Sequence, residues 1–297
     1  MRLDLSIVIV NWNVRELLDG CLASLYANIA ELSFEVIVVD NASQDDSIEM
    51  VRTKYPAAVL IANQENAGFC RGNNQGIEIS RGDFVALLNP DTEVSSGAME
   101  KMISFLKMNP NVGTVGPTLI DSKGKTEPNG TRFPTLLHEL GKMMRLQGLL
   151  GVEYDFTGYE AEESTKVWSV DVVCGACMLI RRAVLEDIGG LDEQLFMFYE
   201  ETDFCLRAHR AGWRTVYLPA ARIFHHWMGS VRQDEIRSAR RFFRSRYLYF
   251  RKHHGECSSL LLRLFGNGMV LFRIIKIRLV RVREYFRSHL HKIGSRQ

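Results

Sequence analysis

Short apolar runs alternate with helix-like segments along the first part of the chain. The runs at residues 5–10, 36–39 and 59–61 are each followed by polar residues and then by apolar residues at helical spacing. Such alternation is typical of parallel strands, because these are joined by right-handed crossovers that contain a helix and not by tight turns. We therefore expect an α/β fold with a mainly parallel sheet.

A fourth apolar run, residues 84–88, stops abruptly at Asn89, Pro90 and Asp91. Proline cannot donate a hydrogen bond to a sheet ladder, so the strand is expected to end there. Ligands of open α/β sheets gather at the carboxyl ends of the strands, which makes Asp91 a candidate site residue. The alternative is that Asp91 only caps a helix at residues 97–108.

Two earlier strands also end in polar side chains. Asn11 and Asn13 follow the first strand, and Asp40 and Asn41 follow the second. Because the carboxyl ends of parallel strands lie at one edge of a sheet, we expect these four side chains on the same edge as the fourth strand's carboxylate. Asp40 could instead form an Asx turn or cap the helix that follows it.

Three acids crowd between aromatic residues in the sequence FYEETDFCLR, residues 198–207. They are Glu200, Glu201 and Asp203. Like charges nearby and an apolar wall both raise the pKa of a carboxylate toward the range useful for a general base. On a helix, Glu201 and Asp203 would point roughly 160° apart, so they cannot both be the base. The alternative is that the acids simply begin a helix and complement its dipole.

Six motifs occur in the order VDNASQDDS, NAGFCRGNNQGI, NPDTEV, CGACMLIRR, GGLDEQLFMFYEETDFCLRAHRAGW and HHWMGS. Together, over about residues 4–230, they resemble the family 2 glycosyltransferases, particularly the rhamnosyltransferase-like branch. The resemblance implies a Rossmann-like nucleotide-diphospho-sugar transferase domain of the GT-A type. It also implies sugar transfer with inversion and a divalent cation, Mg²⁺ or Mn²⁺.

The resemblance also implies roles for single residues. Asp91 stands at the position of the family's metal-binding DXD-type motif, with Asn89 in place of the first Asp, and His225 matches a histidine that completes the metal site in some relatives. Glu201 matches the catalytic carboxylate, and Asp203 is the alternative base. The expected substrate-binding residues are Asn11, Asn13, Asp40, Asn41, Arg71, Asn73, Asn89, Glu200 and Arg207.

Cys174 and Cys177 form a C-x-x-C pair in VVCGACMLIRR. A redox or zinc role is disfavoured, because no second Cys/His pair at zinc spacing follows. We expect a strand whose small residues let a ligand approach the backbone.

Charge is unevenly distributed along the chain. Residues 231–297 hold 17 Lys and Arg against 4 Asp and Glu, a balance of +13, whereas residues 1–230 hold 20 against 31, a balance of −11. Because the basic segment is also rich in apolar residues, we expect a helical tail lying on an anionic membrane. The alternatives are a basic helical cap on the catalytic domain and a nucleic-acid arm, which the apolar content disfavours.

The sequence contains no candidate transmembrane segment. The longest uncharged stretch of the tail, residues 264–272, has nine residues, whereas a spanning helix needs about 20. No signal segment precedes the first strand. We expect a cytoplasmic protein with reduced thiols, held peripherally at the inner face of the cell membrane.

These features predict a GT-A domain at residues 1–230 and a basic amphipathic helical tail at residues 231–297. The expected activity is inverting transfer of rhamnose or a similar hexose from a dTDP- or UDP-sugar. The expected acceptor is a saccharide or a polyprenyl-linked saccharide used in cell-surface polysaccharide synthesis, and no nucleic acid is expected as a partner. The alternative is a nucleotide-sugar-binding protein or regulator without turnover. A Rossmann dehydrogenase is disfavoured, because the G-x-G-x-x-G fingerprint is absent.

Overall fold

The computed structural model describes residues 3–127, 129–144, 166–226 and 235–266. The chain divides into two compact units. The first comprises residues 1–134 and 153–230, and the second comprises residues 135–152 and 231–297. The sequence predicts one division, at residue 230, with residues 135–152 in the first part. In the structure, residues 135–152 belong to the second unit. Each unit is described by itself below.

The elements of the first unit alternate between strands and helices through most of its length. In chain order they are β1 (Leu3–Asn11), α1 (Arg15–Asn28), β2 (Phe34–Asp40), α2 (Ser47–Lys54), β3 (Val59–Ala62), α3 (Phe69–Ile79), β4 (Gly82–Leu88), β5 (Thr92–Val94), α4 (Ala98–Met108), β6 (Val112–Ile120), β7 (Thr126–Glu127), β8 (Trp168–Val170), β9 (Cys177–Arg181), α7 (Arg182–Ile188), α8 (Glu200–Arg210) and β10 (Arg214–His225).

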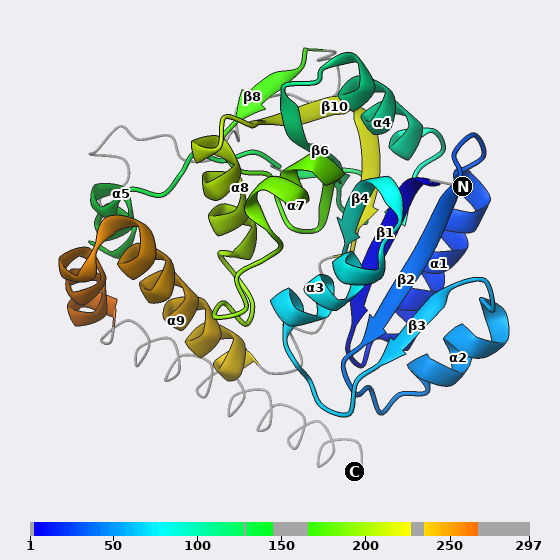
Figure 1. The fold of residues 1–297 in the computed structure, drawn as a ribbon. Helices are drawn as coiled ribbons and strands as arrows, with labels where there is room; N and C mark the ends of the chain where they lie inside the picture. The colour runs from blue at the N-terminus through cyan, green and yellow to red at the C-terminus, as the bar shows by residue number, and fades with distance from the viewer. Residues whose placement is uncertain (1–2, 128, 145–165, 227–234, 267–297) are drawn as a thin grey trace, which may run out of the picture. The chain divides into compact units, whose positions relative to one another are not determined.

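Among the described residues, the strands form one ten-stranded sheet in the order β3-β2-β1-β4-β9-β6-β10-β5, with β7 beside β6 and β8 beside β10. β3, β2, β1 and β4 run parallel to one another, as do β6 and β10. β9 lies antiparallel between β4 and β6, and β5 is antiparallel to β10. Figure 1 shows β1, β2 and β3 side by side, with β3 at the edge of this sheet. The expected α/β fold with a mostly parallel sheet is confirmed.

β1 is covered on both faces, which explains why its sequence is a continuous apolar run. Successive side chains of a strand point to opposite faces. Leu5, Ile7 and Ile9 belong to the main apolar cluster, which also contains the buried Leu residues of α1 and the buried Met99 and Met102 of α4. Val8 and Val10 meet α3 on the other face. The sheet therefore separates α1 and α4 from α3.

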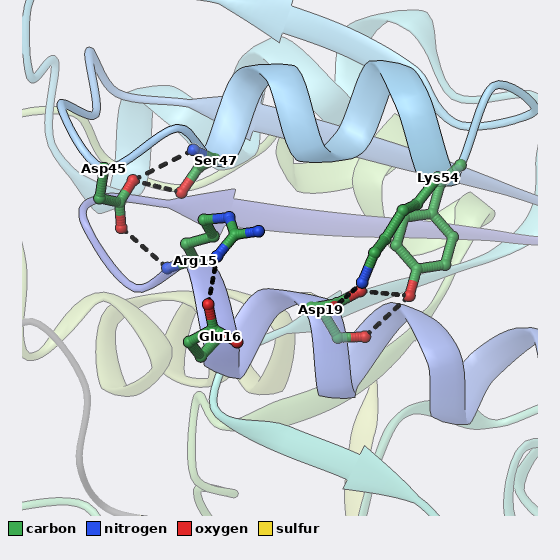
Figure 2. A network of polar contacts seen from close by, with 7 residues as sticks. Arg15, Glu16, Asp19, Asp45, Ser47 and Lys54 are labelled. Carbon is green, nitrogen blue, oxygen red and sulfur yellow. Dashed lines mark hydrogen bonds and ion pairs between the residues drawn. The ribbon is translucent and has the colours of Figure 1, made fainter.

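Polar contacts fix the two loops that follow β1 and β2 (Figure 2). Asp45 accepts a hydrogen bond from the backbone N–H of Arg15 at 2.8 Å and also accepts from the N–H and hydroxyl of Ser47. One carboxylate thereby binds the first turns of α1 and α2. At the far end of α2, Lys54 and Tyr55 both donate to Asp19 of α1.

Two element boundaries differ from those expected from the sequence. α4 has Gly97 as its N-cap residue, at φ +71°, and β5 lies between Asp91 and that helix. The interpretation of Asp91 as a cap of this helix is therefore wrong. The strand expected over VVCGACMLIRR begins only at Cys177, because Gly175 and Ala176 form a turn before it.

In the second unit, the described helices are α5 (Leu136–Met144), α9 (Glu235–His254) and a helical stretch at residues 256–266. Arg246 of α9 and Glu139 of α5 are both buried, and their side chains approach to 3.3 Å. The described part of the basic tail, residues 235–266, is helical with a break at Gly255. The rest of the expected helical tail, residues 267–297, lies outside the described residues. No helix in the described part of the chain combines the length and the apolar character that crossing a membrane requires.

Candidate functional site

Asp91 and His225 lie side by side at the carboxyl edge of the sheet. β4 ends just before Asn89, whose backbone N–H donates to Ala176 O at 2.9 Å and so fixes the turn. β5 then pairs with β10 in a register that sets Thr92 opposite His225. As a result, Nε2 of His225 is 3.3 Å from Oδ1 of Asp91. Only 5% of Asp91 and 4% of His225 is exposed.

This pair has the chemistry of a partial cation site. Carboxylate oxygen suits Mg²⁺ and Mn²⁺, and imidazole nitrogen suits Mn²⁺ better than Mg²⁺. Within residues 3–127, 129–144, 166–226 and 235–266, no group of three His, Cys, Asp or Glu side chains could hold a metal ion. Asn89, which stands in place of the first Asp of the DXD-type motif, carries no negative charge. A cation bound by Asp91 and His225 would therefore take most of its ligands from a substrate or from water.

A second histidine–carboxylate pair adjoins the first and was missed in the sequence. Nε2 of His226 lies 2.8 Å from Oε1 of Glu93, and the backbone N–H of His226 donates to Asp91 O at 2.9 Å. The available signal was the spacing of the two acids, Asp91 directly before β5 and Glu93 within it, together with two consecutive histidines at the end of β10. Glu93 is half-exposed, so this pair lies nearer the surface than Asp91 and His225.

Glu200 and Glu201 begin α8 after two residues with strained backbones. Phe198 and Tyr199 adopt φ values of +71° and +66°, a region that non-glycine residues rarely occupy and that concentrates at functional sites. Only 7% of Glu200 is exposed, and its Oε2 atom has no hydrogen-bond partner. Burial raises the pKa of Glu200 well above its usual value, and the adjacent charge of Glu201 raises it further.

Glu201 is the partly exposed member of the pair. Burial also raises the pKa of Glu201, but hydrogen bonds from its own backbone N–H and from Glu200 favour the ionised form. Of the two acids, Glu200 therefore favours its protonated form more strongly, and Glu201 is the more readily ionised. The arrangement yields one carboxylate that can accept a proton, supported by a carboxylic acid beside it.

The turn before β9 connects these acids to the turn at Asn89. A side chain starting on Gly175 would begin 3.8 Å from Oε1 of Glu200 and 4.0 Å from Oε2 of Glu201. The next residue, Ala176, accepts the hydrogen bond from Asn89. The expected approach of a ligand to the backbone of this segment stays a prediction, since these contacts lie within the chain.

The cysteines of the same segment are poor nucleophiles. Burial raises the pKa of the Cys174 thiol to about 12, and the charges of Glu201, Glu200 and Asp91 add to the rise. Burial also raises the pKa of Cys177 strongly. All six cysteines of the chain lie in the described residues and are free thiols.

Asp203 and Arg207 form an ion pair in which the carboxylate is buried and the guanidinium is partly exposed. Arg207 Nε donates to Asp203 Oδ2 at 2.8 Å, and its other nitrogens donate to Ile188 O at 2.8 Å and Gly190 O at 2.7 Å. Asp203 has no exposed surface. The pair joins α8 to the end of α7 and the loop after it. The donor nitrogens of Arg207 are therefore used in contacts within the protein.

Asp40 and Asn11 are bonded to each other where β2 and β1 end. Asn11 Nδ2 donates to Asp40 Oδ2 at 2.7 Å, and the backbone N–H of Ser43 donates to Asp40 Oδ1 at 2.8 Å. The turn-forming role considered for Asp40 is therefore present. Each carboxylate oxygen has two lone pairs, so Asp40 retains acceptor capacity for a ligand.

Asn13 and Asn41 tie neighbouring loops together. Asn13, at φ +53°, accepts from the N–H of Gln44 through Oδ1 at 2.6 Å. Asn41 Nδ2 donates to Gly68 O at 3.2 Å, and Asn41 Oδ1 accepts from Asn63 at 2.9 Å. These amides hold the loops after β1 and β2 and the start of α3 at one edge of the sheet.

The glycines of NAGFCRGNNQGI serve packing inside the protein. A Cβ atom on Gly76 would collide with Val8, and one on Gly72 would lie 2.9 Å from Val10 Cγ1. A Cβ atom on Gly68 would lie 2.7 Å from the ring of Phe196. The start of α3 is thereby fixed to the loop that precedes the acid pair.

Of the two polar residues expected to face a ligand from α3, one is exposed and one is buried. Arg71 is exposed. Asn73 is buried, and its Nδ2 donates to Phe69 O one turn earlier at 3.0 Å. The fold thus brings Asn89, Asp91, His225, Glu200 and Glu201 together, whereas Asp203, Arg207 and Asn73 make internal contacts.

Family models match most of the chain. The model described as "Glycosyl transferase family 2" matches residues 6–189, and the model described as "Glycosyl transferase family group 2" matches residues 155–290.

Two curated relatives are similar over much of their length. The chain is 27% identical over 282 residues to the N-acetylglucosaminyl-diphospho-decaprenol L-rhamnosyltransferase of Mycobacterium tuberculosis, with 91% of each protein covered. It is 31% identical over 212 residues to the low-salt glycan biosynthesis hexosyltransferase Agl10 of Haloferax volcanii, covering 70% of this chain and 62% of the relative.

Solved structures share the fold at low identity. The mannosyltransferase PcManGT from Pyrobaculum calidifontis, in complex with GDP-Man and Mn²⁺, has a TM-score of 0.56 and 15% identity, covering 95% of this chain and 81% of that chain. GalNAc-T7 with UDP, GalNAc and Mn²⁺ has a TM-score of 0.58 and 14% identity, covering 77% and 45%.

Proposed function

The chain belongs to glycosyl transferase family 2 and is a hexosyltransferase with a GT-A fold, and from this premise we propose its substrates and mechanism. The donor is a nucleotide-diphospho-sugar, dTDP-rhamnose or a UDP-hexose. The acceptor is a saccharide or a polyprenyl-linked saccharide used in cell-surface polysaccharide synthesis. Transfer proceeds with inversion at the anomeric carbon.

The observation that supports this mechanism best is the link between Glu201 and the turn at Asp91. Gly175 lies against Glu200 and Glu201, and its neighbour Ala176 bonds to Asn89. A group that accepts a proton and a group that can hold a cation thus flank the same short segment. Inverting transfer uses a base on the acceptor hydroxyl, and positive charge such as that of a cation stabilises the leaving diphosphate.

Glu201 is the proposed general base. Its carboxylate takes the proton from the acceptor hydroxyl as the hydroxyl oxygen bonds to the anomeric carbon, and the bond from that carbon to the nucleotide diphosphate breaks. Glu200 is the proposed positioning residue, because its protonated carboxyl donates to Glu201 and keeps it ionised. Asp203 is less suited to this step, because its carboxylate already accepts a hydrogen bond from Arg207.

Asp91 and His225 are the residues that would hold Mg²⁺ or Mn²⁺. A cation there supplies positive charge for the diphosphate as it leaves. The two relatives' structures that contain Mn²⁺ support a divalent metal. The buried contact between Asp91 and His225 supports the choice of these side chains.

The proposed nucleotide side is the edge where β1 and β2 end. Asp40 accepts from the ring N–H of a pyrimidine base, and Asn11, Asn13 and Asn41 shape the loops around base and ribose. Arg71, exposed on α3, is available to a phosphate. Asn73, Asn89 and Arg207 complete the proposed binding residues by positioning backbone segments, as their internal hydrogen bonds support.

The proposed location is the cytoplasmic face of the cell membrane. A polyprenyl-linked acceptor resides in a membrane, and the relative from Mycobacterium tuberculosis carries decaprenol in its name. The balance of +13 over residues 231–297 supports attraction to an anionic surface. The role of residues 231–297 as a separate membrane-binding tail is part of this proposal.

A screen of donors tests the proposal. Purified protein is incubated with dTDP-rhamnose, UDP-hexoses and GDP-mannose, with and without Mn²⁺, and with membrane extract as acceptor, and released nucleotide diphosphate is measured. We expect release from one dTDP- or UDP-sugar that requires both Mn²⁺ and extract. Binding of a nucleotide sugar without release from any donor would favour the alternative, a binding protein without turnover.

A further inference from the structure

The helical stretch at residues 256–266 presents two contrasting faces. On one face, Ser259, Leu262 and Gly266 are buried, and Ser259 Oγ donates to Tyr247 O of α9 at 3.0 Å. The contact fixes this stretch against α9 within the second unit. The opposite face is therefore held outward in a defined orientation.

That outward face is apolar. Leu260, Leu261, Leu264 and Phe265 are 58%, 40%, 67% and 50% exposed. At 100° per residue, they fall within an arc of about 140°. Large exposed apolar residues elsewhere in the described chain are scattered singly, as is normal, whereas these four lie within six consecutive positions. Such clustering indicates a surface that binds something apolar.

Basic residues are exposed on the same helix as this apolar face and at the end of α9. Arg263 lies at the edge of that face on the same helix, and Arg251 and Lys252 are exposed at the end of α9. Glu256 is the acid of this region and lies 3.9 Å from Arg251. The whole segment from residue 231 carries the balance of +13. An occupant with both apolar groups and negative charge is therefore favoured.

We propose that Leu260, Leu261, Leu264 and Phe265 insert into the interface of an anionic lipid bilayer, with Arg251, Lys252 and Arg263 at the level of the headgroups. Two copies of so basic a surface would repel each other, which disfavours self-association. An anionic bilayer has negatively charged headgroups above an apolar interior, and an interfacial helix binds both. The inference rests on the proposed function only in that a polyprenyl-linked acceptor gives the enzyme a reason to bind membrane.

Vesicle co-sedimentation of the full-length protein tests this surface. The variant Leu260→Ser/Leu264→Ser removes two exposed side chains, so its fold should persist. Met108→Ser is the control, because Met108 is also an exposed apolar residue, 72% exposed, but lies on α4 in the first unit. We expect the double variant to bind phosphatidylglycerol-containing vesicles roughly tenfold or more weakly than the wild type, from the lost apolar transfer. The control should bind as the wild type does, and high salt should weaken both.

An environment-sensitive fluorophore reports the insertion directly. Cys257 is the exposed cysteine of the chain and lies on the outward side of this helix. A label on Cys257 should shift to the blue with anionic vesicles, whereas a label on Met108→Cys in a Cys257→Ser background should not. Equal pelleting of the double variant and the wild type, or no shift at Cys257, would overturn the proposal. The proposal would also be overturned if the double variant still bound vesicles but no longer dimerised or no longer bound an acidic protein. Since neither readout needs transfer, an inactive protein that still inserts would contradict the proposed function and leave this surface standing.

Discussion

Nε2 of His225 lies 3.3 Å from Oδ1 of Asp91, although the two residues are 134 positions apart in the sequence. The antiparallel pairing of β5 with β10 creates this contact, because it sets Thr92 opposite His225. The contact joins the segment after the carboxyl end of β4 to the carboxyl end of β10. It is the basis for the proposed cation site.

Asp91→Asn should abolish metal-dependent transfer. The amide keeps the size of the side chain but removes the anionic ligand, so we expect activity to fall by roughly 10²-fold or more, as for loss of charge stabilisation on a leaving group. The increase in Tm caused by Mn²⁺ and nucleotide should also shrink. Glu93→Gln is the matched control on the neighbouring strand and should retain both. Full wild-type activity in EDTA would argue against the cation.

Glu201→Gln should lose roughly 10²-fold or more in kcat while still binding the nucleotide sugar, as expected when general-base help is removed. Binding is measured by calorimetry and transfer by nucleotide release. The base would have to be reassigned to Asp203 if Glu201→Gln were active and a folded Asp203→Asn were dead.

Asp203→Ala should act through stability instead. It leaves the partly exposed Arg207 without its buried partner, and since breaking a fully buried pair costs about 3–5 kcal/mol, we expect a loss of about 2–3 kcal/mol. Lys107→Ala is the control, since it breaks the exposed pair with Asp4, for which the expected loss is below about 1 kcal/mol. Both values come from denaturant unfolding. Equal losses for the two variants would show that the Asp203–Arg207 pair adds nothing beyond a surface contact.

Glu200 should make the folded state less stable as pH rises. Burial raises its folded pKa well above the ordinary value of 4.5, so the folded protein binds more protons than the unfolded chain above that pH. The free energy of unfolding therefore decreases from about pH 4.5 upward until the folded pKa is passed. Glu200→Gln should remove this decrease and gain stability relative to the wild type as pH rises from 5 to 8. A constant difference across this range would contradict a protonated Glu200.

The pH profile of transfer distinguishes a positioning role for Glu200. The hydrogen bond from Glu200 lowers the pKa of Glu201. Glu200→Gln can still donate this bond and should keep the acid limb of kcat near its wild-type position. Glu200→Ala cannot, and its acid limb should move to higher pH. Identical limbs in the two variants would leave Glu200 with a purely structural role.

Gly76→Ala should destabilise the first unit by about 1–3 kcal/mol, because the added methyl group would collide with Val8 and push α3 from β1. Gly20→Ala is the control. It lies within α1, and a Cβ there meets only Glu93 Oε1 at 3.6 Å. The control should be neutral or stabilising, since alanine favours a helix. A similar loss for both would contradict the close packing of α3.

Local sequence patterns predicted the elements but not their contacts. The strands β1, β2, β3 and β4 follow from apolar runs, and their polar ends follow from the direction of parallel strands. The roles of Asn73 and of the glycines at 72 and 76 did not follow, because packing of α3 on β1 depends on the whole sheet. The shortening of β9 to begin at Cys177 and the buried Glu139–Arg246 pair likewise depend on partners distant in sequence.

The most direct test of the account is transfer to a defined acceptor. Wild type and Glu201→Gln are each incubated with the donor selected by the screen, Mn²⁺ and a polyprenyl-diphosphate-linked saccharide, and the product is measured by mass spectrometry and its anomeric configuration by NMR. We expect the wild type to add one hexose with inverted configuration and Glu201→Gln to add almost none. A retained configuration, or equal product from both proteins, would contradict the mechanism.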